Sequence, residues 1–145
     1  WPMEAQASEK NSDVNSFEML GRVLPLLVTA PVYRDRSISE LGTRIMAAVA
    51  SGKIRYYFRG HSLIGFVTWA YFTSEEARTS EFDWNEVLMR SGGEELWIVD
   101  MVGLDSVLYI GRDIRRYLSE TTNHKVAYWR RSKNGRRLGK AWRLR

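Results

Sequence analysis

The sequence contains no cysteine among its 145 residues and has three prolines. The missing cysteine excludes a disulfide framework, a thiolate nucleophile and a zinc site built on cysteine. Apolar runs are short as well. The longest, residues 23–32, is interrupted by Pro25 and Pro31, whereas a membrane-spanning helix needs roughly 20 apolar residues. The first residues also lack the basic and apolar regions of a signal peptide. We therefore expect a soluble, cytoplasmic protein without a membrane span.

The composition is that of a globular domain, with 44% apolar and 27% charged residues. This balance excludes disorder over the whole chain, and the length corresponds to one ordinary domain. We divide the chain into a flexible N-terminal arm (1–15), a core (16–123) and a basic C-terminal hairpin (124–145). The hairpin is expected to complete the same domain as the core.

The net charge of +5 is unevenly distributed. Residues 124–145 hold nine Lys and Arg and no acid, whereas the rest of the chain has 13 bases and 17 acids. A basic end of this kind is expected to contact an acidic partner, such as a nucleic acid, an anionic membrane surface or an acidic protein. The candidate contact residues are Arg130, Arg131, Lys133, Arg136, Arg137, Lys140 and Arg143.

Aromatic residues alternate with these bases, as in Tyr128-Trp129-Arg130-Arg131. Arginine with exposed aromatics suits single-stranded nucleic acid, through phosphate contacts and base stacking. The alternative is a hairpin whose aromatics face the core while its arginines are solvated.

Apolar spacing predicts a first helix that begins near Ser16 and a second that Ser37 or Ser39 caps. The apolar face of the second runs from Ile38 to Val49, and Gly52 ends it as a C-cap. Pro25 is expected to kink the first helix or end it early. Two strands, residues 54–58 and 63–72, are predicted to form a hairpin. Thr73, followed three residues later by Glu76, predicts a capping box that opens a third helix or helical turn.

A further strand is predicted over residues 95–102, with Leu96, Ile98, Asp100 and Val102 on one face. Asp105 or Ser106 is expected to cap a helix that ends near Leu118. Its apolar set is Val107, Leu108, Ile110, Ile114 and Tyr117. Asn134-Gly135 predicts a tight turn between strands 125–131 and 136–144. This order predicts an α+β protein with a mostly antiparallel central sheet flanked by helices.

Four short motifs follow one another along the chain: Leu20-Gly21-x-Val23, Pro31-x-Tyr33-Arg34, Trp69-Ala70 and Trp97-Ile98-Val99-Asp100. In this order and spacing they resemble the RTX toxin-activating lysine acyltransferases, over about residues 17–120. The resemblance implies a GNAT-like acyltransferase fold. It also implies transfer of a fatty acyl group from acyl carrier protein to a lysine of a protein toxin, without a permanently bound cofactor. Because members of that family tend to dimerise, a homodimer is one expected state.

The resemblance places the reacting pair at Asp100 and Tyr33. The family has a histidine at the position of Tyr33 and a serine at the position of Ala30. A tyrosine, whose ordinary pKa is near 10, is a poor base at neutral pH but can protonate a leaving thiolate. Asp100 then acts as the base, or orients and stabilises a charged partner. The alternatives are an ion pair with an arginine for Asp100 and a packed, hydrogen-bonded ring for Tyr33.

Two functions therefore remain open at this level. In the first, the protein is an acyltransferase with Asp100 and Tyr33 at its reactive cleft. In the second, it is a catalytically inactive relative that uses the basic hairpin as a binding or assembly module, on nucleic acid or within a larger particle. The retained aspartate favours the first, and the absent histidine and serine favour the second. His61, expected in an exposed turn, and His124 are not spaced as metal ligands, so no metal site is predicted.

Overall fold

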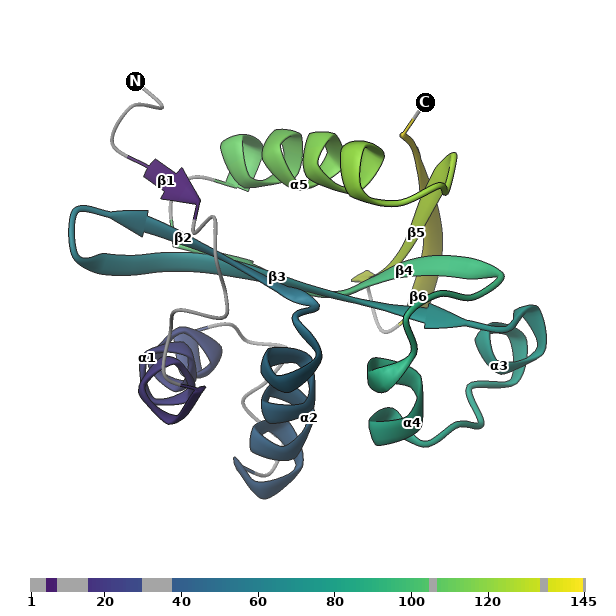
Figure 1. Cartoon of the computed structure of the whole chain (residues 1–145), viewed down its shortest axis with the longest axis horizontal. Helices are drawn as coiled ribbons and strands as arrows, with labels where there is room; N and C mark the ends of the chain where they lie inside the picture. Colours follow the sequence, from purple (N-terminus) through teal and green to yellow (C-terminus); the bar gives the residue numbers. More distant parts are fainter. Residues whose placement is uncertain (1–4, 8–15, 30–37, 105–106, 134–135, 145) are drawn as a thin grey trace.

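The computed structural model describes residues 5–7, 16–29, 38–104, 107–133 and 136–144. A six-stranded sheet separates two layers of helices (Figure 1). Neighbouring strands are antiparallel except β4 and β5, which are parallel. The prediction of an α+β protein with a mostly antiparallel sheet is therefore confirmed. In chain order, which is also their order in the sheet, the strands are β1 (Ala5–Ala7), β2 (Ile54–Arg59), β3 (Ser62–Phe72), β4 (Glu95–Gly103), β5 (Val126–Lys133) and β6 (Arg136–Arg143).

The helices are divided unequally between the two faces of the sheet (Figure 1). Four cover one face and α5 (Val107–Thr121) covers the other. The four are α1 (Ser16–Thr29), α2 (Ile38–Ser51), α3 (Ser74–Thr79) and α4 (Trp84–Met89). Within the described residues, no helix is long and apolar enough to cross a membrane.

Local sequence signals account for most element boundaries. Pro25 lies inside α1, which continues to Thr29, so the early termination considered for this helix does not occur. Gly52 follows α2 with a φ of 72°, as a C-cap glycine should. Thr73 accepts a hydrogen bond from the backbone of Glu76 while the Glu76 side chain accepts one from Thr73, so the capping box is present.

Three elements differ from the sequence-based expectation. Ala5–Ala7, expected within a flexible arm, pairs as β1 with the edge of β2, and the rest of residues 1–15 lies outside the described part. The short helix α4 was not predicted, although Asp83 caps it. On α5, Val107 and Leu108 are exposed, because the face that meets the sheet is formed by Ile110, Asp113, Ile114 and Leu118.

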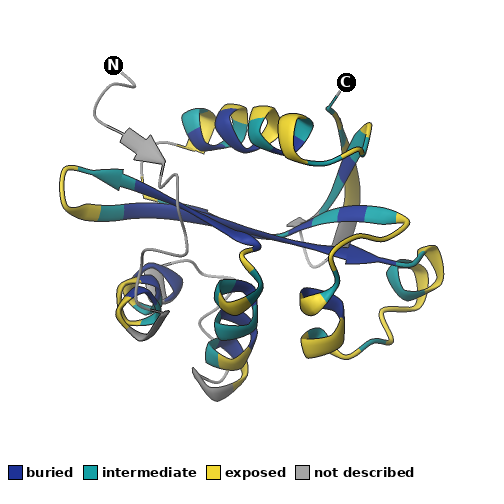
Figure 2. Cartoon of the chain, in the orientation of Figure 1, coloured by how far each residue is buried: buried dark blue, intermediate teal, exposed yellow. Residues whose placement is uncertain are grey.

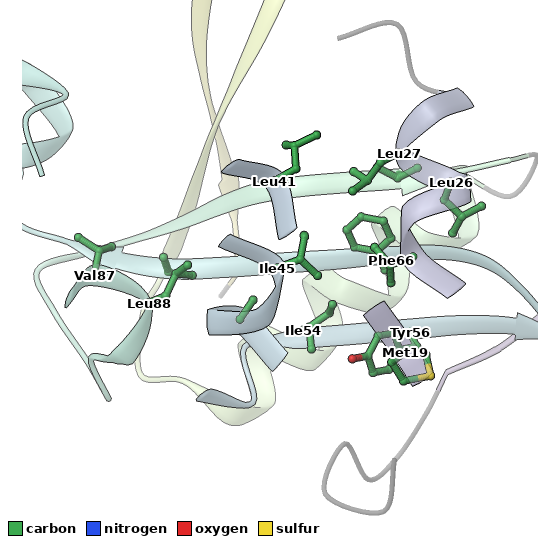
Figure 3. Close-up of a cluster of buried hydrophobic side chains, with 14 of the residues drawn as sticks. Met19, Leu26, Leu27, Leu41, Ile45, Ile54, Tyr56, Phe66, Val87 and Leu88 are labelled. Carbon is green, nitrogen blue, oxygen red and sulfur yellow. The ribbon is translucent and has the colours of Figure 1, made fainter. Parts of the chain in front are cut away.

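The core has two parts, one on each face of the sheet. On the larger side, α1, α2 and α4 pack their apolar faces on β2 and β3 (Figure 3), as for Met19, Ile45 and Leu88 against Ile54, Tyr56 and Phe66. On the other side, Ile110, Ile114 and Leu118 of α5 cover the opposite face of the same strands. Figure 2 shows the resulting buried centre of the sheet. Trp69, part of one of the four motifs, is buried within this second cluster.

Candidate functional site

Of the two predicted reactive residues, Asp100 lies on β4 and is 3% exposed, whereas Tyr33, like Ala30, lies outside the described residues. The pairing of Tyr33 with Asp100 therefore stays a prediction. Among the predicted partner contacts, Lys140 and Arg143 are exposed on β6. The remaining side chains lie outside the described part, although their backbone belongs to β5 and β6: Arg130, Arg131, Lys133, Arg136 and Arg137.

Both carboxylate oxygens of Asp100 accept hydrogen bonds from neighbouring elements. Nη2 of Arg44, on α2, lies 2.6 Å from Oδ1, and Oγ1 of Thr68, on β3, lies 2.7 Å from Oδ2. All three residues are buried. A buried carboxylate is costly unless a cation and hydrogen-bond donors compensate it. The ion pair considered as an alternative for Asp100 is therefore present, and it compensates the buried charge.

Arg44 also links this ion pair to the helical layer. Its guanidinium carbon lies 5.3 Å from the centroid of the Trp84 ring, at the start of α4. This is the range of a cation–π contact, which favours a cation that is shielded from water. Two helices and two strands therefore converge on the Arg44–Asp100 pair, and tertiary contacts fix its position.

A β-bulge in β4 turns Asp100 toward the helices. Thr68 pairs with Asp100 and Trp69 pairs with Ile98, so Val99 is an extra residue without a partner on β3. The strict alternation predicted for residues 95–102 is consequently wrong. Ile98 packs on the α5 side, whereas Val99 and Asp100 both meet the α1–α2 side. Bulges often lie next to active sites, because they re-aim a side chain without ending the strand.

The parallel pairing of β4 with β5 ends close to Asp100. It comprises three residue pairs, and the last is Ile98 with Trp129. Asp100 lies two residues beyond this last pair. Backbone at the point where two strands cease to pair can offer donors and acceptors to an extended ligand. The arrangement therefore places a charge-compensated carboxylate close to the point where the β4–β5 pairing ends.

A second buried polar cluster occupies the opposite face of the sheet. Asp113 of α5 accepts hydrogen bonds from Nε of Arg55 at 2.7 Å, the Tyr57 hydroxyl at 2.6 Å and Nη2 of Arg116 at 2.8 Å. Burial alone would raise the pKa of Asp113, but the hydrogen bonds from Arg55 and Tyr57 outweigh it and hold that pKa below its ordinary value. Burial also raises the pKa of Tyr57, so its hydroxyl stays a donor. This cluster ties α5 to β2.

An apolar groove of about 780 Å³ crosses the outer surface of the larger helical layer. Leu20 and Leu24 of α1, Met46 of α2 and Met89 of α4 are among its lining residues, and Asp100 is not. The groove is therefore separate from the carboxylate. Within the part of the chain that the structure describes, no group of three or more His, Asp or Glu side chains could hold a metal ion.

The aromatic residues of the basic hairpin contact the body of the protein. The Tyr128 ring stacks on Trp97 at a centroid distance of 5.3 Å. The ring centroids of Trp129 and Trp142 lie 5.5 Å apart, and both rings pack against the part of the core beneath α5. These contacts match the alternative in which the hairpin aromatics face the core. The paired strands of the hairpin confirm its predicted β-structure.

Sequence reasoning missed Arg44, Thr68 and the Asp113 cluster, yet a signal for them exists. Arg44 lies on the apolar face of its helix, next to Leu41 and Ile45, just as Asp113 lies next to Ile114. A charge on an otherwise buried face needs a partner of opposite sign. Two such positions therefore indicate buried ion pairs, although they do not identify the partners.

The sequence matches the profile of the RTX toxin acyltransferase family over residues 12–141. It is 27% identical over 129 residues to the RTX-II toxin-activating lysine-acyltransferase ApxIIC of Actinobacillus pleuropneumoniae, covering 79% of this chain and 81% of that protein. It is 32% identical over 112 residues to the leukotoxin-activating lysine-acyltransferase LtxC of Aggregatibacter actinomycetemcomitans, covering 70% of this chain and 61% of that protein.

Among solved structures, the chain resembles the loading GNATL domain of CurA from Lyngbya majuscula. The TM-score is 0.64 at 8% sequence identity, and the match covers 87% of this chain and 64% of that one. At this identity the likeness concerns the fold. The predicted GNAT-like fold, a mostly antiparallel sheet flanked by helices, is thereby confirmed.

Proposed function

The chain belongs to the RTX toxin acyltransferase family, and we propose that it transfers a fatty acyl group from an acyl carrier protein to a lysine side chain of a protein substrate. Asp100 carries this proposal. It is a buried, charge-compensated carboxylate that lies two residues beyond the point where β4 and β5 cease to pair. A carrier-protein donor also favours a cytoplasmic reaction, since fatty acyl carrier proteins work there.

The reaction forms a bond between the lysine nitrogen and the acyl carbon and breaks the carbon–sulfur bond of the thioester. Overall, one proton passes from the nitrogen to the departing sulfur. The attacking amine must be neutral, so a group in the site has to accept or balance its proton. We assign this role to Asp100, and we assign protonation of the thiolate to the Tyr33 hydroxyl, because a tyrosine stays protonated at neutral pH.

Arg44 and Thr68 are positioning residues in this scheme. Their hydrogen bonds fix both oxygens of Asp100, and Arg44 compensates its charge. A carboxylate held in this way needs no reorganisation when positive charge develops on the attacking nitrogen, which is the general advantage of a preorganised site. We therefore expect these residues to affect the rate through Asp100 rather than through the substrate.

The non-enzymatic alternative, a module that binds nucleic acid or joins an assembly through the basic hairpin, stays a prediction. Its charge argument is unchanged, since Lys125, Lys140 and Arg143 are exposed. Its stacking argument is weaker, because Trp129 and Trp142 pack against the core. We therefore place the hairpin bases in a supporting role for an acidic protein partner.

The proposal is tested by incubating the protein with an acylated carrier protein and an RTX-type toxin, and by detecting the acylated lysine by mass spectrometry. We expect the substitution Asp100→Asn to lower the rate by about 10²-fold or more. Tyr33→His should raise it. Lack of product with the unmodified protein, or an unchanged rate for Asp100→Asn, would contradict the proposal.

Asp113→Asn is the matched control. Asp113 is also buried and paired with arginine, but it lies on the opposite face of the sheet. Both substitutions should destabilise the fold. We expect Asp113→Asn to keep the rate per folded molecule, so that a selective loss in Asp100→Asn reports on chemistry.

A further inference from the structure

Three apolar side chains are exposed where β4 leads into α5. Leu104 is 55% exposed, Val107 50% and Leu108 79%. They neighbour one another in sequence, and Leu104 directly follows the last residue of β4. The sheet is covered instead by other side chains of α5, such as Ile110 and Ile114. A cluster of large apolar side chains in water favours an interface with another molecule.

The outer face of α5 continues this apolar cluster with positive charge. Arg112 and Arg115 are exposed four and seven residues after Leu108, which places them on one side of the helix. Among the described residues of α5, the acids are Asp113, which is buried, and Glu120, near the end of the helix. Asp105 lies outside the described part. The outer face of α5 therefore combines exposed apolar side chains at the start of the helix with two cations.

We propose that Leu104, Val107, Leu108, Arg112 and Arg115 form the docking surface for an acidic carrier protein. This inference rests on the proposed function and names the place where its donor binds. An apolar centre bordered by arginine is typical of protein interfaces. The positive charge selects an acidic partner and steers its approach.

The position of the surface agrees with the path that the donor must take. Leu104 is four residues beyond Asp100, or roughly 13 Å along an extended strand at 3.3 Å per residue. Between them β4 continues past Ile98, where its pairing with β5 ends, along its edge on the β5 side. A carrier docked on α5 can lay its thioester-bearing arm along this edge and present the acyl carbon near Asp100.

The same surface suits the lysine-bearing substrate less well. A segment around the acceptor lysine brings positive charge, which Arg112 and Arg115 would repel. Exposed leucine and valine also offer little to a nucleic acid, whose binding relies on phosphate contacts and stacking. The donor protein is therefore the partner that both features favour.

Direct binding tests the surface without requiring catalysis. The affinity of the full chain for acyl carrier protein is measured by calorimetry for the unmodified protein, for Leu108→Glu and for Arg112→Glu. We expect each variant to bind about tenfold more weakly, which is the size of a moderate interface contact. The matched controls are Met89→Glu, an exposed apolar position on α4, and Arg78→Glu, an exposed cation on α3. Both controls should bind as the unmodified protein does.

Kinetics with two donors adds a second readout. With acyl carrier protein, Leu108→Glu should raise KM about tenfold. With acyl-pantetheine, which carries the arm but no protein, the variant should keep the rate of the unmodified protein. If the unmodified protein neither binds the carrier nor uses it, both the proposed function and this inference fail. If it binds and uses the carrier but both variants behave as the controls do, the docking surface is wrong and the proposed function stands.

Discussion

Arg44 and Asp100 are 56 positions apart in the sequence, yet their side chains form a buried ion pair with 2.6 Å between Nη2 and Oδ1. The pair joins α2 to β4 at the bulge created by Val99. It therefore couples the packing of the helical layer to the orientation of the candidate catalytic carboxylate. A change at Arg44 is expected to affect both stability and reaction rate.

The first prediction concerns the cost of breaking this pair. Arg44→Met leaves Asp100 buried without its cation, and we expect the free energy of unfolding to fall by about 3–5 kcal/mol. The double substitution Arg44→Met with Asp100→Leu removes both charges and should cost less than Arg44→Met alone. Urea denaturation of the two variants measures the difference. A double variant that is less stable than the single one would contradict this account of the pair.

An exposed ion pair supplies the control for this prediction. Arg22 and Glu18 lie 3.2 Å apart on α1, with side chains 43% and 58% exposed. Solvent screens such a pair, so Arg22→Met should change the free energy of unfolding by about 1 kcal/mol or less. The contrast between Arg44 and Arg22 then reports on burial rather than on the loss of an arginine.

The second prediction uses two adjacent tyrosines of β2. The Tyr57 hydroxyl donates to Asp113, whereas the buried Tyr56 hydroxyl has no hydrogen-bond partner among the described residues. Burial raises the pKa of Tyr56 to about 12, so both rings stay neutral near pH 7. Tyr57→Phe should cost about 1–3 kcal/mol, because it removes a donor from a buried carboxylate. Tyr56→Phe should be neutral or stabilising. Equal losses for the two variants, measured by urea denaturation, would contradict the hydrogen-bond assignment.

Local signals in the sequence were sufficient for the elements that depend on near neighbours. The capping box of Thr73 and Glu76, the C-cap at Gly52 and the hairpin turn at Gly60 all lie where the sequence predicts them. In each case the determining contact spans a few residues, so the local pattern contains it. The four short motifs, taken together in their order and spacing, were likewise sufficient to identify the family.

Tertiary pairing decided the features that sequence reasoning missed. The bulge at Val99 depends on how β4 registers against β3, which alternation within β4 cannot reveal. Leu108 is apolar and fits the predicted apolar face of its helix. The hydrogen bonds between Asp113 and its partners on β2 determine which side of α5 meets the sheet, and Leu108 is not on that side. The side-chain partners of a buried charge are likewise a property of the packed fold.

The third prediction is a pH dependence that arises at Glu76. Two hydrogen bonds from Arg90, at 2.5 and 2.8 Å, and one from the Thr73 backbone lower the pKa of Glu76 from 4.5 to about 2. A lowered folded-state pKa means that this stabilisation is complete above about pH 5 and is lost as the pH falls toward 2. Glu76→Gln keeps an acceptor for the capping box but removes the charge.

We therefore expect Glu76→Gln to lower Tm at neutral pH and to approach the Tm of the unmodified protein between pH 5 and pH 2. Thermal unfolding followed by circular dichroism across this range measures the difference. Glu81→Gln, at an exposed position, is the control for replacing a glutamate and should lower Tm at neutral pH by less than Glu76→Gln does. If the Tm difference between Glu76→Gln and the unmodified protein stays constant down to pH 2, the ion pair with Arg90 is not its source.

The fourth prediction concerns two glycines that are paired across β3 and β4 beneath α5. A Cβ on Gly103 would lie 2.9 Å from Cδ1 of Ile110, whereas a Cβ on Gly65 would lie 2.6 Å from that atom and also 2.6 Å from the carbonyl oxygen of Val102. Each substitution to alanine should therefore cost about 1–3 kcal/mol through overpacking. Ile110→Val removes Cδ1 but leaves the carbonyl oxygen in place. In a protein that already carries Ile110→Val, Gly103→Ala should cause little further loss in the free energy of unfolding. Gly65→Ala should still cause most of its loss. Because backbone cannot yield as a side-chain tip does, equal rescue of both glycine variants in urea denaturation would show that the carbonyl oxygen of Val102 does not limit the space at Gly65.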